Sequence, residues 1–173
     1  GQAVIRDLHG FGCKIYAYDK YENEAVKQFA EYADLSVIYE KCDLITLHMP
    51  LSEDNFHIID ASAMKNMKDG VVIINTARGS LIDTKALIEA LESGKGGAAG
   101  LDVIEDELGM YYYNRKSDIL SKRDLYVLRG FPNVIVTPHM AFYTDQAVSD
   151  MVKHSIESCI LREAGKKDPW EVV

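Results

Sequence analysis

Short apolar runs, each closed by polar residues, recur along the chain at intervals that suit strands separated by helices. Most of these runs lack polar–apolar alternation, which is typical of parallel strands that are buried on both faces. The predicted strands cover residues 14–18, 44–47, 71–74, 98–101 and 134–136. We therefore expect a parallel sheet whose two faces are both covered.

Between the strands, apolar residues recur at helical spacing. The clearest helix lies near the C-terminus, where the apolar positions begin at Ala147 and the cap is Thr144 or Asp145. A second helix has Asp83 as its N-cap and ends near Gly94, and a third begins at the first residue of the chain. Strands that alternate with helices predict an α/β fold with a doubly wound parallel sheet.

Residues 105–129 interrupt this alternation, and three consecutive tyrosines, 111–113, lie in a polar stretch of the segment. A lid or an interface is one interpretation of these tyrosines. A packed surface loop is the interpretation that the statistics of long loops favour. We therefore predict a long loop over this segment.

Composition narrows the class of protein. The chain has 173 residues, of which 47% are hydrophobic and 27% are charged, as in a globular domain with a sizeable core. A net charge of −8 argues against binding to a nucleic-acid backbone. No apolar run is long enough to span a membrane. The three cysteines are far apart and odd in number, which favours a reducing, cytoplasmic compartment over a disulfide framework.

Polar residues close the predicted strands at the edge where doubly wound sheets bind ligands. These residues are Asp19, 48–50, 75–79, Asp102 and 137–139. Each alone has a structural explanation, but five such groups at one edge favour a site. Asp19 can accept both ribose hydroxyls of an adenosine and repel a 2′-phosphate, which favours NAD over NADP. Gly1, 18 residues earlier, fits the last glycine of a dinucleotide-binding turn.

Three further residue types suit hydride transfer to a 2-keto acid. Arg78 offers a planar fork of donors that matches a carboxylate, and His139 is a candidate proton donor. A carboxylate is needed to orient the imidazole and favour its protonated form, and Glu105, Asp106 and Glu107 all supply one. The histidines and cysteines show no metal-ligand spacing, so we expect no metal.

Three motifs together resemble the D-isomer-specific 2-hydroxyacid dehydrogenases. The motifs are Asn-Thr-Ala-Arg-Gly-Ser-Leu-Ile-Asp at 75–83, Gly-Leu-Asp-Val-Ile-Glu-Asp-Glu at 100–107 and Asn-Val-Ile-Val-Thr-Pro-His-Met-Ala-Phe-Tyr-Thr at 133–144. The resemblance implies a Rossmann-type NAD-binding domain inserted into a smaller substrate domain, with catalysis in the cleft between them. It implies that Arg78 binds the substrate, that His139 is the acid/base, and that Glu107, five residues after Asp102, orients the histidine.

The resemblance also implies the cofactor contacts. Asp19 would hold the adenosine ribose, Asp102 would lie at the nicotinamide end, and Arg78 is also among the implied cofactor contacts. The remaining implied contacts are Met49, Pro50 and Asn55 along the adenine and Thr76 and Ala77 beside the nicotinamide ribose.

Within the family, Phe142-Tyr143-Thr144 and the tyrosine-bearing segment after Glu107 look like the D-lactate branch. A phosphoglycerate- or glycerate-type dehydrogenase is one alternative, and an NAD-responsive corepressor that binds protein partners is another. We expect residues 1–142 to form the NAD-binding domain, without its first strand and most of its glycine turn. Residues 143–173 are expected to form a C-terminal helix and tail that pack toward the substrate domain, and the whole protein is expected to be a homodimer.

Overall fold

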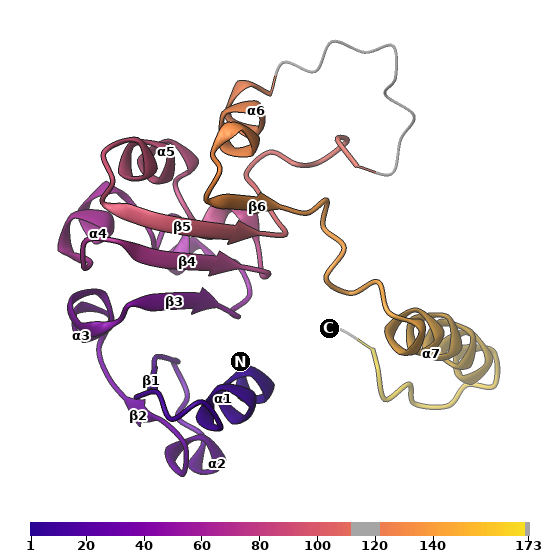
Figure 1. Ribbon diagram of the computed structural model, residues 1–173. Coiled ribbons are helices and arrows are strands. Elements are labelled where there is room, and N and C mark those ends of the chain that lie inside the picture. Colours follow the sequence, from indigo (N-terminus) through magenta and orange to yellow (C-terminus); the bar gives the residue numbers. More distant parts are fainter. Residues whose placement is uncertain (112–121, 172–173) are drawn as a thin grey trace. The chain divides into compact units, whose positions relative to one another are not determined.

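The computed structural model describes residues 1–111 and 122–171, which form two compact units, Gly1–Pro138 and His139–Val173. The fold of the first unit is built on a four-stranded parallel sheet with the strand order β3-β4-β5-β6 (Figure 1). Its strands are β3 (Leu44–Leu47), β4 (Val71–Asn75), β5 (Gly96–Leu101) and β6 (Val134–Val136). The four strands predicted here are confirmed, and every neighbouring pair is parallel.

A second, two-stranded parallel sheet precedes the larger one. It pairs β1 (Tyr16–Ala17) with β2 (Glu31–Tyr32), so the predicted strand at 14–18 is confirmed but shortened. The helix predicted at the start of the chain is α1 (Gln2–His9), with Gly1 as its N-cap. The other helices of this region are α2 (Glu24–Lys27) and α3 (Leu35–Lys41).

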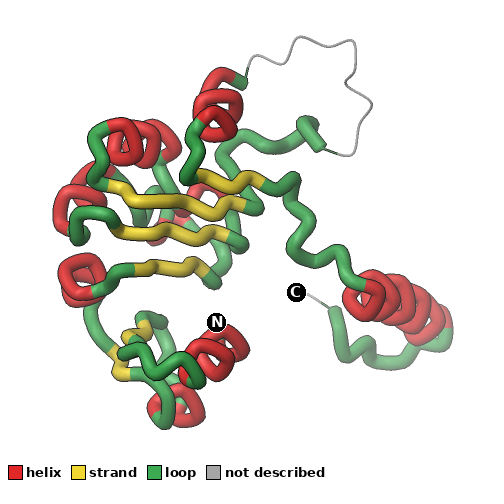
Figure 2. Tube along the Cα trace, in the orientation of Figure 1, coloured by secondary structure: helices red, strands yellow, loops and turns green. Residues whose placement is uncertain are grey.

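Helices connect the strands of the larger sheet, as Figure 2 shows. They are α4 (Ala61–Asn66), α5 (Thr84–Glu92) and α6 (Arg123–Gly130), with short 3-10 turns η1 (Glu53–Asn55) and η2 (Gly79–Leu81). The Asp83 side chain caps α5 by accepting hydrogen bonds from the amides of Lys85 and Ala86. Gly94 follows the helix with φ of 79°, a conformation that favours glycine, as predicted.

The loop predicted over 105–129 is wrong at its C-terminal end, because α6 occupies part of it. Leu125 and Leu128, three residues apart, are buried and hold this helix against the core. Tyr112 and Tyr113 of the tyrosine run lie outside the described residues.

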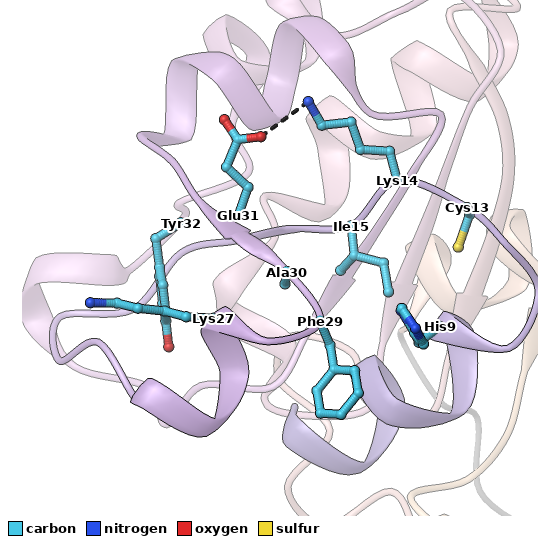
Figure 3. Close-up of a pocket in the computed structure, with 9 residues that line it drawn as sticks. All are labelled: His9, Cys13, Lys14, Ile15, Lys27, Phe29, Ala30, Glu31 and Tyr32. Carbon is cyan, nitrogen blue, oxygen red and sulfur yellow. Dashed lines mark ion pairs between the residues drawn. The ribbon is translucent and has the colours of Figure 1, made fainter.

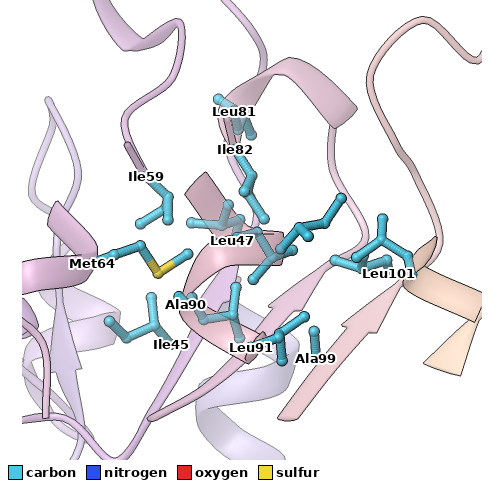
Figure 4. Packing of buried hydrophobic residues seen from close by; sticks show 14 of the residues in the cluster. Ile45, Leu47, Ile59, Met64, Leu81, Ile82, Ala90, Leu91, Ala99 and Leu101 are labelled. Atoms are coloured by element: carbon cyan, nitrogen blue, oxygen red, sulfur yellow. The ribbon is translucent and has the colours of Figure 1, made fainter. Parts of the chain in front are cut away.

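The hydrophobic core lies between one face of the larger sheet and its helices (Figure 4). Ile73 of β4 is 1% exposed, and Ile45 and Leu47 of β3 are also buried. The expectation that both faces are buried is wrong within this unit. Leu44 and Ile135 are 46% and 70% exposed, and they lie on β3 and β6, the two edge strands of this sheet.

The second unit contains the predicted C-terminal helix, α7 (Asp145–Glu163). Thr144 is its N-cap and accepts a hydrogen bond from the Ala147 amide, which resolves the choice between Thr144 and Asp145. None of the residues of α7 is buried. Among the described residues, we find no helix with the length and hydropathy needed to cross a membrane.

Candidate active site

The polar residues that follow β4 and β5, and Thr137 after β6, lie at one edge of the first unit, because the strands are parallel neighbours. Asp19 follows β1, which belongs to the other sheet. A cavity of about 990 Å³ nevertheless brings together Gly1, Asp19 and Met49 in its lining. The cavity therefore brings together two of the residues predicted for the adenosine side, Asp19 and Met49, whereas Pro50 and Asn55 are not among its lining residues.

The loop that carries Arg78 is held by a side chain to which the sequence analysis assigned no role. Asn75, the last residue of β4, is 0% exposed. Its Oδ1 accepts a hydrogen bond from the Ala77 amide at 3.0 Å, and its Nδ2 donates to the Arg78 carbonyl at 2.8 Å. The arginine side chain is exposed, and Nη1 donates to the Ala77 carbonyl at 2.7 Å. The one signal for Asn75 in the sequence is a polar residue at the end of a buried strand.

The loop after β5 is anchored through Asp102, which is 5% exposed. The Asp102 amide donates to the Asn75 carbonyl at 2.9 Å, and its Oδ1 accepts a hydrogen bond from the Thr137 hydroxyl at 2.5 Å. Asp102 therefore ties the ends of β4, β5 and β6 together. Further along the loop, Glu107 is half-buried, and its Oε2 accepts a hydrogen bond from the Ile104 amide at 3.2 Å.

The Arg78 loop and the Glu107 loop touch through their main chains. A Cβ added to Gly79 would lie 2.1 Å from the carbonyl carbon and oxygen of Ile104 and 2.6 Å from the Glu105 amide nitrogen. Only glycine permits this approach. Arg78 and Glu107 therefore project from loops that are packed directly against each other.

The three candidate carboxylates differ in their surroundings. Glu105 binds the His57 ring at 2.6 Å and the Thr84 amide at 2.8 Å, one through each carboxylate oxygen. Burial acts to raise the pKa of Glu105, but the hydrogen bonds from His57 and Thr84 outweigh it, so the pKa lies below its ordinary value. Asp106 is exposed, with φ of 53°. Both oxygens of Glu105 are used within the fold, which favours another carboxylate for orienting a histidine.

Residues predicted along the adenosine lie on exposed loops. The Asp19 carboxylate is exposed and accepts a hydrogen bond from the Tyr21 amide at 3.1 Å. Asn55 holds its own loop together, since Oδ1 accepts from the Ser52 amide at 2.8 Å and Nδ2 donates to the Pro50 carbonyl at 2.8 Å. Its amide therefore fixes the loop in which Met49 and Pro50 lie.

His139 begins the second unit, has φ of 53° and is half-buried. The residue two positions before it, Thr137, is fixed in the first unit by hydrogen bonds to Leu101 and Asp102. A juxtaposition of His139 with Arg78 and Glu107 therefore stays a prediction.

Another pocket, of about 530 Å³, involves none of the predicted site residues. Figure 3 shows its lining by α1, α2 and β2, with an ion pair of 3.0 Å between Lys14 and Glu31. Among the residues that the structure describes, no group of three His, Cys, Asp or Glu side chains is arranged to hold a metal ion.

Comparison with known proteins identifies relatives of the whole chain. The family model described as D-isomer specific 2-hydroxyacid dehydrogenase, NAD binding domain, matches residues 1–141. An aromatic 2-oxoacid reductase from Clostridium sporogenes is 49% identical over 154 residues, which cover 88% of this chain and 46% of the relative. The chain thus spans about half the length of the curated relatives it matches.

Solved structures show the same fold. A D-lactate dehydrogenase from Treponema pallidum superposes with a TM-score of 0.94 and 34% identity, covering 99% of this chain and 52% of that one. A D-lactate dehydrogenase with NAD+ from Lactobacillus jensenii gives a TM-score of 0.91 at 36% identity, covering 100% and 52%. The predicted Rossmann-type fold and NAD-binding class are confirmed.

Proposed function

Because the chain belongs to the D-isomer specific 2-hydroxyacid dehydrogenase family, we propose that it supplies the NAD-binding part of an enzyme that reduces a 2-keto acid to the D-2-hydroxy acid. The observation that carries this proposal is the contact of Gly79 with the main chain of Ile104 and Glu105. This contact sets Arg78 and Glu107 on adjoining loops. The relatives named as D-lactate dehydrogenases and an aromatic 2-oxoacid reductase support pyruvate or a larger 2-keto acid as the substrate.

The residues present fit NAD. The cavity that Gly1 and Asp19 line has the volume of a small-molecule site, and the exposed Asp19 carboxylate suits two ribose hydroxyls. When bound as NADH, the cofactor supplies the hydride. We assign the cofactor contacts to Asp19, Met49, Pro50, Asn55, Thr76, Ala77, Arg78 and Asp102.

Residues of this chain are assigned to substrate binding and to proton transfer. Arg78 binds the substrate carboxylate and carbonyl oxygen through its planar fork of N–H donors. His139 donates the proton to the carbonyl oxygen, and Glu107 orients the imidazole and favours its charged form. Two residues of extended chain span at most about 7 Å, which keeps the Cα of His139 close to that of the anchored Thr137 and supports this assignment.

The assembly of the whole protein is part of the same proposal. Residues 1–142 form the NAD-binding domain, and residues 143–173 pack toward a substrate domain that lies outside this chain. The whole protein acts as a homodimer in the cytoplasm, where the three free thiols of this chain suit a reducing environment. Size-exclusion chromatography with light scattering tests the dimer.

Two substitutions in the full-length protein test the catalytic assignment. His139→Gln should lower kcat for pyruvate or phenylpyruvate by about 10²–10⁴-fold while NADH affinity is retained, because positioned proton transfer contributes that factor. Arg78→Lys keeps the charge but loses the bidentate fork, so the keto-acid KM should rise and kcat should fall. Wild-type kinetics in both variants would refute the assignment.

A further inference from the structure

A third loop meets the two that carry Arg78 and Glu107. Residues 57–59 run parallel to residues 80–82, with the His57 amide donating to the Ser80 carbonyl at 2.9 Å and the Ile59 amide donating to the Leu81 carbonyl at 3.0 Å. His57 is thus fixed by its main chain beside the turn that follows Arg78.

The side chain of His57 reaches across to the opposite loop. Its Nε2 lies 2.6 Å from Glu105 Oε1, although the two residues are 48 positions apart in the sequence. Both side chains are largely shielded from solvent, with 28% and 24% of their surfaces exposed. The Phe56 ring stacks on the imidazole with centroids 3.9 Å apart, which restrains the orientation of the ring. A shielded pair of this kind resists screening by solvent and salt better than an exposed one.

The second oxygen of Glu105 completes the connection. Oε2 accepts a hydrogen bond from the amide of Thr84, the first residue of α5. A carboxylate at a helix N-terminus is favoured by the helix dipole and satisfies an otherwise unpaired amide. Glu105 therefore joins the loop of His57 to the start of α5, five residues after Gly79.

The main chain at His57 adopts a strained conformation. Its φ of 52° is uncommon for a residue other than glycine. Such strain persists where the surroundings hold it, and it is often found at functional sites. Here the strain lets the amide of His57 bind Ser80 while the ring of the same residue binds Glu105.

We propose that His57 and Glu105 form a positioning pair that sets the distance between the loop of Arg78 and the loop of Glu107. The proposal rests on the proposed function, because it concerns how those two groups are held for keto-acid reduction. Arg78 lies two residues before Ser80, and Glu107 lies two residues after Glu105. Neither member of the pair is assigned a contact with substrate or cofactor.

Two substitutions of His57 in the full-length protein separate positioning from mere folding. His57→Gln carries an amide nitrogen close to the place of Nε2 and keeps a donor for Glu105. His57→Asn carries its amide nitrogen near the place of Nδ1, out of reach, and asparagine tolerates positive φ. Both variants lose the stacking on Phe56, and the positive φ of this position favours asparagine over glutamine. A higher kcat/KM in His57→Gln than in His57→Asn would therefore report on the bond to Glu105.

Lys95→Ala is the matched control. Lys95 forms an ion pair with Asp69 at 2.8 Å, in which the Lys95 side chain is 25% exposed, like that of His57, whereas the Asp69 side chain is 89% exposed. This pair lies just before the starts of β4 and β5, at the opposite edge of the sheet. Its loss should lower the melting temperature without changing the keto-acid kinetics.

The measurements are kcat and KM for the keto acid, the dissociation constant for NADH and the melting temperature. We expect His57→Asn to lower kcat/KM by about 10–10²-fold, in both kcat and KM, because displacing a catalytic group by ~1 Å has effects of this order. NADH affinity should stay within about twofold, and His57→Gln should restore most of kcat/KM.

The outcomes distinguish this inference from the function on which it rests. A full-length wild-type protein without keto-acid reductase activity would overturn both. An active wild type whose His57→Asn variant keeps its kcat/KM, or loses it no more than Lys95→Ala does, would overturn the positioning pair alone. Equal losses in His57→Asn and His57→Gln would also overturn it, because the hydrogen bond to Glu105 would then make no difference.

Discussion

Replacing Gly79 by alanine tests the contact on which the proposed site depends. The new Cβ would lie 2.1 Å from the carbonyl carbon and oxygen of Ile104, whereas ordinary contact begins at 3.4 Å. Ile104 is buried and the atoms involved are main chain, so a side-chain rotation does not relieve the overlap. The loops of Arg78 and Glu107 would have to separate by more than an ångström. Overpacking of this kind typically costs about 1–3 kcal/mol.

The expected result is a loss of both stability and activity. At the upper end of that range, the melting temperature of a domain of this size should fall by roughly 6–12 °C. A displacement of ~1 Å should lower kcat/KM for the 2-keto acid by about 10²-fold. Thermal unfolding and steady-state kinetics of the full-length protein provide both numbers.

Gly130→Ala is the control for this prediction. Gly130 is the last residue of α6, and apart from its chain neighbours and its own helix backbone no described atom lies within 4 Å of a Cβ at this position, so alanine should be tolerated there with little change. A Gly79→Ala variant that matched Gly130→Ala in melting temperature and kcat/KM would refute the claim that the two loops are packed main chain against main chain.

Three further predictions follow from single side chains. Asn75→Ala leaves the Ala77 amide and the Arg78 carbonyl without their partner, so stability should fall by about 1–3 kcal/mol in urea unfolding and the keto-acid KM should rise; an unchanged unfolding midpoint would count against this. Asp19→Ala should reduce the preference for NADH over NADPH by ~10-fold, or about 1.4 kcal/mol, as the ratio of kcat/KM values; a wild type that already uses both equally would contradict the assignment. Because the folded-state pKa of Glu105 is lowered, its contribution to stability is present above the ordinary carboxyl pKa and is lost as pH falls through the folded value. The urea concentration at the unfolding midpoint should therefore decrease as the pH is lowered below roughly 5. This decrease should be less steep in Glu105→Gln.

The sequence by itself determined which kinds of elements build the larger sheet and their order along the chain, but not the order of the strands within the sheet. Apolar runs closed by polar residues marked β3 to β6, and local signals such as Asp83 and Gly94 marked the ends of α5, because periodicity and capping depend on neighbours in the chain. The same local reasoning missed α6, whose short apolar spacing lies in the same polar segment as the tyrosine run.

The tertiary structure alone decided how the loops at the sheet edge are held together. The bond between His57 and Glu105 joins residues 48 positions apart, and no periodicity or motif spacing encodes such a pairing. Likewise, the sequence presents Gly79 as an ordinary turn glycine. Only the close approach of the Ile104 main chain shows that this position has no room for a side chain. Long-range contacts of this kind depend on where the parallel strands place their connecting loops, and therefore follow from the packed sheet rather than from any one segment.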